Sequence, residues 1–107
     1  MAEWKKILLT PNDTLELAIE LLHKGGFRIA LVADSQRKLV GTVTDGDIRR
    51  ALIDKLTMTS QVKLIMNPNP ISVSNKVENK DILALMTDQD ILHMPIIDEN
   101  GILCGLE

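Results

Sequence analysis

The residues best suited to bind a ligand stand where an apolar segment, residues 39–40, meets a helix-like run, residues 48–52. They are Gly41, Thr44 and Asp47. A glycine lets a ligand approach the backbone, and a hydroxyl together with the amides of a helix N-terminus suits a phosphate. A carboxylate three residues after the hydroxyl can accept hydrogen bonds from both hydroxyls of a ribose. The residue types and their spacing therefore indicate a nucleotide site at a strand-to-helix junction.

The same spacing also has a purely structural interpretation. Thr44 as the N-cap, with Asp47 three residues later, resembles a capping box, and Ser, Thr and Asp commonly begin helices. Taken alone, this pair favours capping over ligand binding. The rest of the chain changes the balance, because it repeats the same layout.

A shift of 64 residues superimposes the two halves of the sequence without a gap. The matched pairs include Gly41 with Gly105, Asp34 with Asp98, Leu39 with Leu103, Leu21 with Leu85, and Ile7 with Ile71. These residues are mostly apolar or turn-forming, so each half is predicted to be the same supersecondary unit.

Each unit is predicted to run strand, helix, strand, strand, helix, which makes the fold class α/β (α+β). The predicted strands are 7–10, 27–33, 39–43, 71–73, 94–97 and a last one from 102. The predicted helices are one that Asp13 and Glu16 cap and that ends at Gly25-Gly26, one at about 45–54 and one at about 79–87. Counterparts of Thr44 and Asp47 would lie beyond Glu107, so the second copy is expected to be truncated. The expected divisions are 1–56, a linker at 57–70 and 71–107.

This arrangement resembles a tandem pair of cystathionine-β-synthase (CBS) domains over nearly all of the chain. The resemblance rests on Gly41, Thr44 and Asp47 in the family's G-h-x-T/S-x-x-D pattern, on the helix start at 13–15, and on Met94-Pro95-Ile96-Ile97-Asp98. It implies two copies packed through their sheets as a pseudo-two-fold pair. It also implies clefts between the copies that commonly take adenine nucleotides such as AMP, ADP or ATP.

The resemblance also implies roles for individual residues. Asp47 and Thr44 would contact the ribose and the phosphate of one nucleotide. The expected border of the base consists of Thr10, Pro11 and the backbone of Ile29, Ala30 and Leu31. The basic cluster of Arg49, Arg50 and Lys55 offers a candidate for a phosphate contact, and His93 is another. Their structural alternatives are a solvated helix face, paired with Asp45 or Asp54, and a partly buried strand histidine.

Composition limits the remaining function classes. The chain has 107 residues, a net charge of −3 and 45% hydrophobic residues, so neither nucleic acid nor a membrane is an expected partner. We expect a cytoplasmic protein without a signal peptide. The single cysteine, Cys104, cannot form an intrachain disulfide, and His23 and His93 lack metal-ligand spacing, so no metal site is expected.

Residues 42–52 resemble the CBS segments attached to sugar-phosphate enzymes. The chain start favours a nucleotidyltransferase related to mannose-1-phosphate guanylyltransferase, with a C-terminal catalytic domain in the parent chain; an arabinose-5-phosphate isomerase is the alternative. The expected function is that of a regulatory nucleotide-binding module that needs no cofactor and has no catalytic residues. A structural dimerisation module is the second class, and an enzyme using Asp45 and Asp47 is the third and weakest.

We also expect a homodimer. Without a final helix in the second copy, apolar surface at Ile82, Leu85, Ile97 or Leu103 would be left partly uncovered, and such patches usually mark a partner surface.

Overall fold

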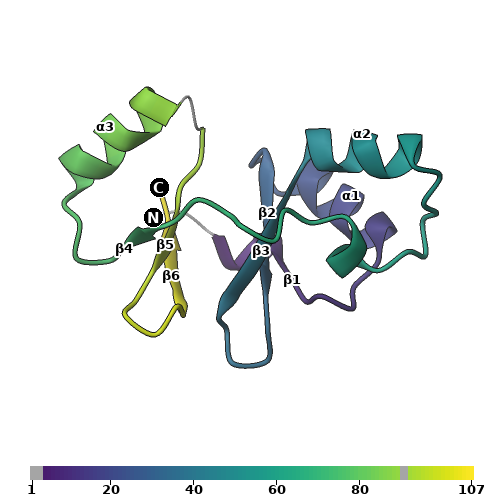
Figure 1. The fold of residues 1–107 in the computed structure, drawn as a ribbon, viewed down its shortest axis with the longest axis horizontal. Coiled ribbons are helices and arrows are strands. Elements are labelled where there is room, and N and C mark those ends of the chain that lie inside the picture. Colours follow the sequence, from purple (N-terminus) through teal and green to yellow (C-terminus); the bar gives the residue numbers. More distant parts are fainter. Residues whose placement is uncertain (1–3, 90–91) are drawn as a thin grey trace.

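The computed structural model describes residues 4–89 and 92–107 and divides into two halves of like topology (Figure 1). The first half contains η1 (Trp4–Ile7), β1 (Leu8–Leu9), α1 (Leu15–Lys24), β2 (Ile29–Ala33), β3 (Leu39–Thr44) and α2 (Asp45–Ile53). Residues 54–72, which we call the connecting segment, contain η2 (Val62–Leu64). The second half contains β4 (Val73–Ser74), α3 (Asn79–Gln89), β5 (Pro95–Ile97) and β6 (Leu103–Leu106). The predicted fold class and element order are confirmed.

Each half has a three-stranded sheet in chain order, with the first pair of strands parallel and the second antiparallel. The register repeats at the shift found in the sequence: Leu9 pairs with Val32, and Val73 pairs with Ile96. Both hairpins also carry an irregularity at equivalent places, after Val32 and after Ile96. The two halves are thus one supersecondary unit used twice.

The two hairpins join each other through a reciprocal pair of backbone hydrogen bonds. The N–H of Leu39 donates to the carbonyl of Gly101, and the N–H of Leu103 donates to the carbonyl of Arg37, each at 3.0 Å. Each bond is the counterpart of the other after a shift of 64 residues. This reciprocity is the local signature of a pseudo-two-fold axis, and Figure 1 shows the two sheets side by side in the middle of the molecule.

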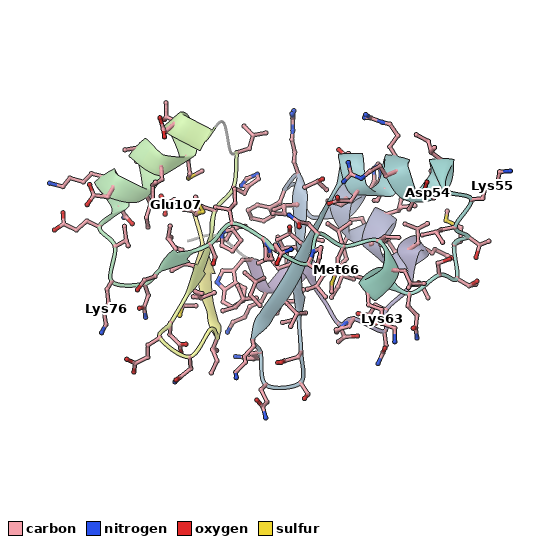
Figure 2. The ribbon with its side chains drawn as sticks, viewed as in Figure 1. Asp54, Lys55, Lys63, Met66, Lys76 and Glu107 are labelled. Carbon is pink, nitrogen blue, oxygen red and sulfur yellow. The ribbon has the colours of Figure 1, made fainter. Side chains whose placement is uncertain are left out.

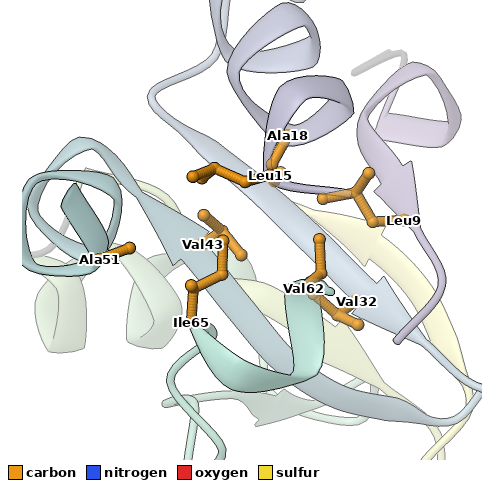
Figure 3. Packing of buried hydrophobic residues seen from close by; sticks show 9 residues of the cluster. Leu9, Leu15, Ala18, Val32, Val43, Ala51, Val62 and Ile65 are labelled. Atoms are coloured by element: carbon orange, nitrogen blue, oxygen red, sulfur yellow. The ribbon is translucent and has the colours of Figure 1, made fainter. Parts of the chain in front are cut away.

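Among the residues that the structure describes, buried hydrophobic side chains form three clusters. In the first half, α1, α2 and η2 cover one face of the sheet, where Leu15, Val43 and Val62 converge with no exposed area (Figure 3). A second cluster joins the copies and contains Ile7, Ile29, Leu31, Ala33, Leu103 and Leu106. A smaller third cluster, formed by Val73, Ile82 and Met94, lies in the second half. Burial of each large apolar side chain contributes roughly 1.5–3 kcal/mol to folding.

The start of α1 differs from the prediction in its capping residue. Thr14 is the N-cap, and its hydroxyl accepts the N–H of Leu17 at 3.2 Å. The Asp13 carboxylate instead accepts the N–H of Thr10 at 2.7 Å and closes the turn before the helix. An aspartate and a threonine in sequence can exchange these two tasks, because both are good acceptors for N-terminal amides.

The expectation of uncovered apolar surface in the second half is wrong for two of its residues. Ile82 is 2% exposed and packs in the third cluster, and Leu103 is 5% exposed in the cluster that joins the copies. Leu85 is 40% exposed. The larger exposed apolar side chains of α2 are Leu52 and Ile53, which the sequence did not single out.

Candidate functional site

The junction between β3 and α2 places a buried carboxylate at the start of a helix. Thr44 is the N-cap in an extended conformation, with φ −122° and ψ 174°. Oδ2 of Asp47 accepts the backbone N–H of Thr44 at 2.9 Å and its hydroxyl at 3.1 Å. Asp47 is only 6% exposed. The capping interpretation of this pair is therefore confirmed, and the helix N-terminus stabilises the buried negative charge.

A third donor reaches the same carboxylate. Nη2 of Arg50 donates to Oδ1 of Asp47, three residues away on the helix, although the Arg50 side chain is 70% exposed. The sequence reasoning paired Arg49 or Arg50 with Asp45 or Asp54 and missed this contact. The spacing of three residues on one helix was the available signal. Arg49 is exposed.

Three adjoining cavities of about 470, 340 and 140 Å³ meet at this junction. They share lining residues: Thr44 borders the first and second, Thr42 and Asn67 the first and third, and Ile29 and His93 the second and third. We call these three cavities together the junction groove. Its walls come from β2, β3 and α2 of the first copy, from the connecting segment, and from the start of β5 in the second copy.

The structure brings together four of the nine predicted site residues in the junction groove. Thr44 and Asp47 line the cavity of about 470 Å³, and Ile29 and His93 line the other two cavities of the groove. The backbone of Leu31 pairs with Leu8 and Thr42 inside the sheet. The remaining predicted residues lie outside the lining of these cavities: Thr10, Pro11, Ala30, Leu31 and Arg49.

Pro11 contacts the connecting segment, and Thr10 is held within its own turn. The carbonyl of Pro11 accepts the N–H of Lys63 at 3.0 Å, and the N–H of Thr10 is held by Asp13. The sequence placed this turn beside the base, but its documented backbone partners lie in the turn itself and in η2. The bond from Lys63 to Pro11 ties this turn to η2, whose Leu64 lines the cavity of about 470 Å³.

The connecting segment forms a wall of the groove that the sequence reasoning did not assign. Asn67 and Thr42 exchange backbone hydrogen bonds of 2.8 and 3.2 Å, so the chain crosses β3 at this point. Figure 2 shows Met66 beside β3 in the middle of the molecule. The signal in the sequence was the Asn-Pro pair, which favours extended backbone but does not say against what it lies.

Gly41 allows the connecting segment to lie close to β3. A Cβ atom at Gly41 would lie 2.5 Å from Sδ of Met66 and 3.0 Å from the carbonyl oxygen of Asn67. The sequence reasoning attributed the glycine to close approach of a ligand. The structure shows instead that it makes room for the connecting segment, which in turn shapes the groove.

His93 lies on the groove wall contributed by the second copy. Its ring meets Phe27 edge-on, with ring centroids 5.4 Å apart and planes inclined by 69°. Burial, and then the charge of Arg28, lower the pKa of His93 from 6.5. Both effects favour the neutral imidazole, and an anion bound in the groove would favour its protonated form.

Other kinds of site have no residues arranged for them in the part of the chain that the structure describes. Within residues 4–89 and 92–107, no group of three or more His, Cys, Asp or Glu side chains is placed to hold a metal ion. None of the helices in these ranges has the length and apolar character needed to cross a membrane.

Comparison with known proteins identifies the repeated unit. The model of the CBS domain family matches residues 4–54 and 62–106. Arabinose 5-phosphate isomerase GutQ from Salmonella typhi is 34% identical over 98 residues, which are 92% of this chain and 30% of that protein. The uncharacterized protein RP505 from Rickettsia prowazekii is 33% identical over 104 residues, 96% of this chain and 32% of that one. The chain thus spans about a third of the length of these relatives.

Two solved structures show the same fold over most of the chain. CBSX2 in complex with AMP has a TM-score of 0.81 at 26% identity, covering 96% of this chain and 81% of that one. A protein with CBS domains from Burkholderia ambifaria has a TM-score of 0.74 at 30% identity, covering 92% and 72%. Together with the family match to both halves, these likenesses show that the chain belongs to the CBS domain family and forms a tandem pair of CBS domains.

Proposed function

We propose that this CBS pair is a regulatory module that binds an adenine nucleotide in the junction groove. The observation that carries the proposal is the buried carboxylate of Asp47, placed at a helix N-terminus and on the wall of a cavity of about 470 Å³. A buried acceptor beside helix amides suits the two ends of a nucleotide, its ribose hydroxyls and its phosphate. The AMP held by the structural relative CBSX2 supports this ligand class.

In this proposal Asp47 accepts the ribose hydroxyls, and the Thr44 hydroxyl turns from Asp47 toward the phosphate. His93 lines two of the three cavities and offers a second phosphate contact once it is protonated. Ile29 supplies apolar surface for the base, with Thr42 and Asn67 beside it. The roles of Thr10, Pro11, Ala30, Leu31 and Arg49 stay predictions from the family resemblance.

The composition of the groove supports a regulatory role. Its walls come from both copies and from the connecting segment, so a ligand that contacts all three changes the relative stability of their arrangements. An attached domain that senses the arrangement would then respond to the nucleotide. We propose no catalytic step for the chain itself.

The chain spans about a third of its curated relatives, and we propose that it works within a larger sugar-phosphate enzyme. The GutQ relatives favour an arabinose-5-phosphate isomerase, the alternative in the sequence reasoning. The nucleotidyltransferase parent, with a C-terminal catalytic domain, has no support from these relatives and stays a prediction from the resemblance.

Titration calorimetry of the chain with AMP, ADP, ATP and GMP tests the proposed function. We expect an adenine nucleotide to bind, and Asp47→Asn to weaken it by roughly tenfold or more, because a hydrogen-bonded charge is lost. Asp81→Asn is the matched control, since Asp81 is also an acidic residue in the first turn of a helix, α3. Equal affinities in the wild type and Asp47→Asn would show that Asp47 only caps α2.

A further inference from the structure

The carboxylate of Asp47 has little hydrogen-bonding capacity left for a ligand in this structure. An ionised carboxylate offers about four lone-pair sites on its two oxygens. Oδ2 accepts the N–H and the hydroxyl of Thr44, and Oδ1 accepts Nη2 of Arg50. About one site remains. The vicinal hydroxyls of a ribose donate two hydrogen bonds, so one of the present donors has to leave.

The three donors differ in how easily they can leave. The backbone N–H of Thr44 is fixed by the start of α2, and its hydroxyl gains a new acceptor only if the ligand carries a phosphate. The side chain of Arg50 is long and 70% exposed, whereas the side chain of Asp47 is 7% exposed. Ion pairs with one partner in solvent contribute little to stability. Arg50 is therefore the donor that a neutral nucleoside displaces.

We propose that Arg50 is a latch on the nucleotide site. Its guanidinium occupies Oδ1 of Asp47 in the unliganded chain, and the vicinal diol of a bound nucleoside displaces it. This inference rests on the proposed function. The displaced guanidinium stays on the wall of the same cavity, which Asp54 also lines. Displacement of Arg50 lowers the affinity for ligands that donate two hydrogen bonds to Asp47. A ligand that donates one uses the remaining acceptor site, and its affinity is unaffected.

The test compares two neighbouring arginines and two nucleosides. Arg50→Met removes the donor and keeps an aliphatic side chain. Arg49→Met makes the same change of charge at the adjacent exposed position, whose predicted contact is with a phosphate that neither nucleoside carries. Adenosine carries the diol but no phosphate, so the Thr44 hydroxyl has no reason to turn. The probe 2′-deoxyadenosine lacks the 2′-hydroxyl and therefore donates only one hydrogen bond to Asp47. Titration calorimetry of the three proteins with both nucleosides, and with AMP as the reference, measures the effect.

We expect Arg50→Met to bind adenosine roughly threefold or more tightly than the wild type and Arg49→Met, in line with the strength of an exposed ion pair. All three proteins should bind 2′-deoxyadenosine equally. An equal gain in Arg49→Met, or a gain for both nucleosides, would overturn the latch, because charge or space alone would then explain the effect. If the wild type binds AMP but Arg50→Met and Arg49→Met bind adenosine with equal affinity, only the latch fails. If no protein binds AMP or adenosine, the proposed function fails and the latch with it.

Discussion

The hydrogen bonds of Asp47 make its structural and its binding roles depend on each other. Its carboxylate holds the first turn of α2 through Thr44, and the same oxygens are the acceptors proposed for a ribose. In the proposed function, a ligand would therefore meet an acceptor that the chain has already aligned and whose charge is partly neutralised. The observed capping is compatible with the proposed binding, so the two interpretations that the sequence posed do not exclude each other.

Removal of the Asp47 side chain should destabilise the chain independently of any ligand. Asp47→Ala deletes the acceptor for the Thr44 N–H and hydroxyl, and we expect the free energy of unfolding to fall by about 1–2 kcal/mol. Urea unfolding without nucleotide measures this. Asp47→Asn keeps one oxygen acceptor and should lose less. Equal losses in the two variants would show that the side-chain oxygen kept in Asp47→Asn does not contribute to capping.

Lys55 occupies a backbone conformation that favours glycine. It follows the C-cap of α2 and has a φ of 66°. The N–H of Lys55 donates to the carbonyl of Leu52, and the N–H of Leu56 donates to the carbonyl of Ala51. These two bonds form a Schellman motif, whose left-handed residue is usually glycine. Lys55→Gly should therefore raise the free energy of unfolding by about 1 kcal/mol. Lys55→Ala is the control, and a similar gain from it would show that strain at this φ is not the cause.

His93 should couple stability to pH. Its pKa is lowered from 6.5 in the folded chain, chiefly by burial and then by Arg28, so the unfolded chain binds its proton more readily. The stability that neutral His93 contributes is present above pH 6.5 and is lost as the pH falls through the lowered pKa. Urea midpoints of the wild type should therefore fall more steeply below about pH 6.5 than those of His93→Gln. Parallel pH profiles would contradict this.

At the scale of elements, local patterns predicted the helices and strands well. The shift of 64 residues came from apolar and turn residues, and the register of Leu9 with Val32 and Val73 with Ile96 repeats it. The path of the connecting segment across β3 could not be predicted, because hydrophobic periodicity describes an element and not what lies on it. The Asp47–Arg50 contact was missed although its spacing was visible, since several carboxylates were within reach of that arginine.

The packing of the connecting segment on β3 can be tested by substitution of Gly41. Gly41→Ala should push the connecting segment off β3, since a Cβ there would lie 2.5 Å from Met66, and we expect a loss of about 1–3 kcal/mol in stability. Gly105, its counterpart in β6, is the matched control, because a Cβ there would meet only Ile96 at 3.6 Å or more. Urea unfolding of the two variants measures the difference. Equal losses would show that strand glycines, and not the crossing, determine the effect.

At the scale of the whole molecule, the two copies are held in one relative orientation by backbone and by core. The reciprocal bonds of Leu39 and Leu103 join the hairpins, and the shared cluster of β2 and β6 residues lies next to them. Because the junction groove takes walls from both copies, this orientation fixes its shape. The copies therefore cannot serve as independent ligand sites joined by a flexible tether, and a ligand in the groove acts on the pair as a unit.

Self-association is the prediction that belongs to the whole molecule, and its basis shifts from the second copy to α2. Leu52 and Ile53 are 53% and 68% exposed, and Leu52 borders a cavity of about 550 Å³ between α1 and α2 that Ile19, Leu22 and Ile48 also line. Exposed apolar surface of this kind commonly marks a partner surface, and two-fold pairing is the commonest form of association. We propose a homodimer through this face.

Sedimentation at micromolar concentration should show a dimer that Leu52→Asp converts to monomer. Leu83→Asp on α3, where the leucine is 52% exposed, should leave it intact. A monomeric wild type would refute the dimer, and dissociation by Leu83→Asp alone would place its interface on α3.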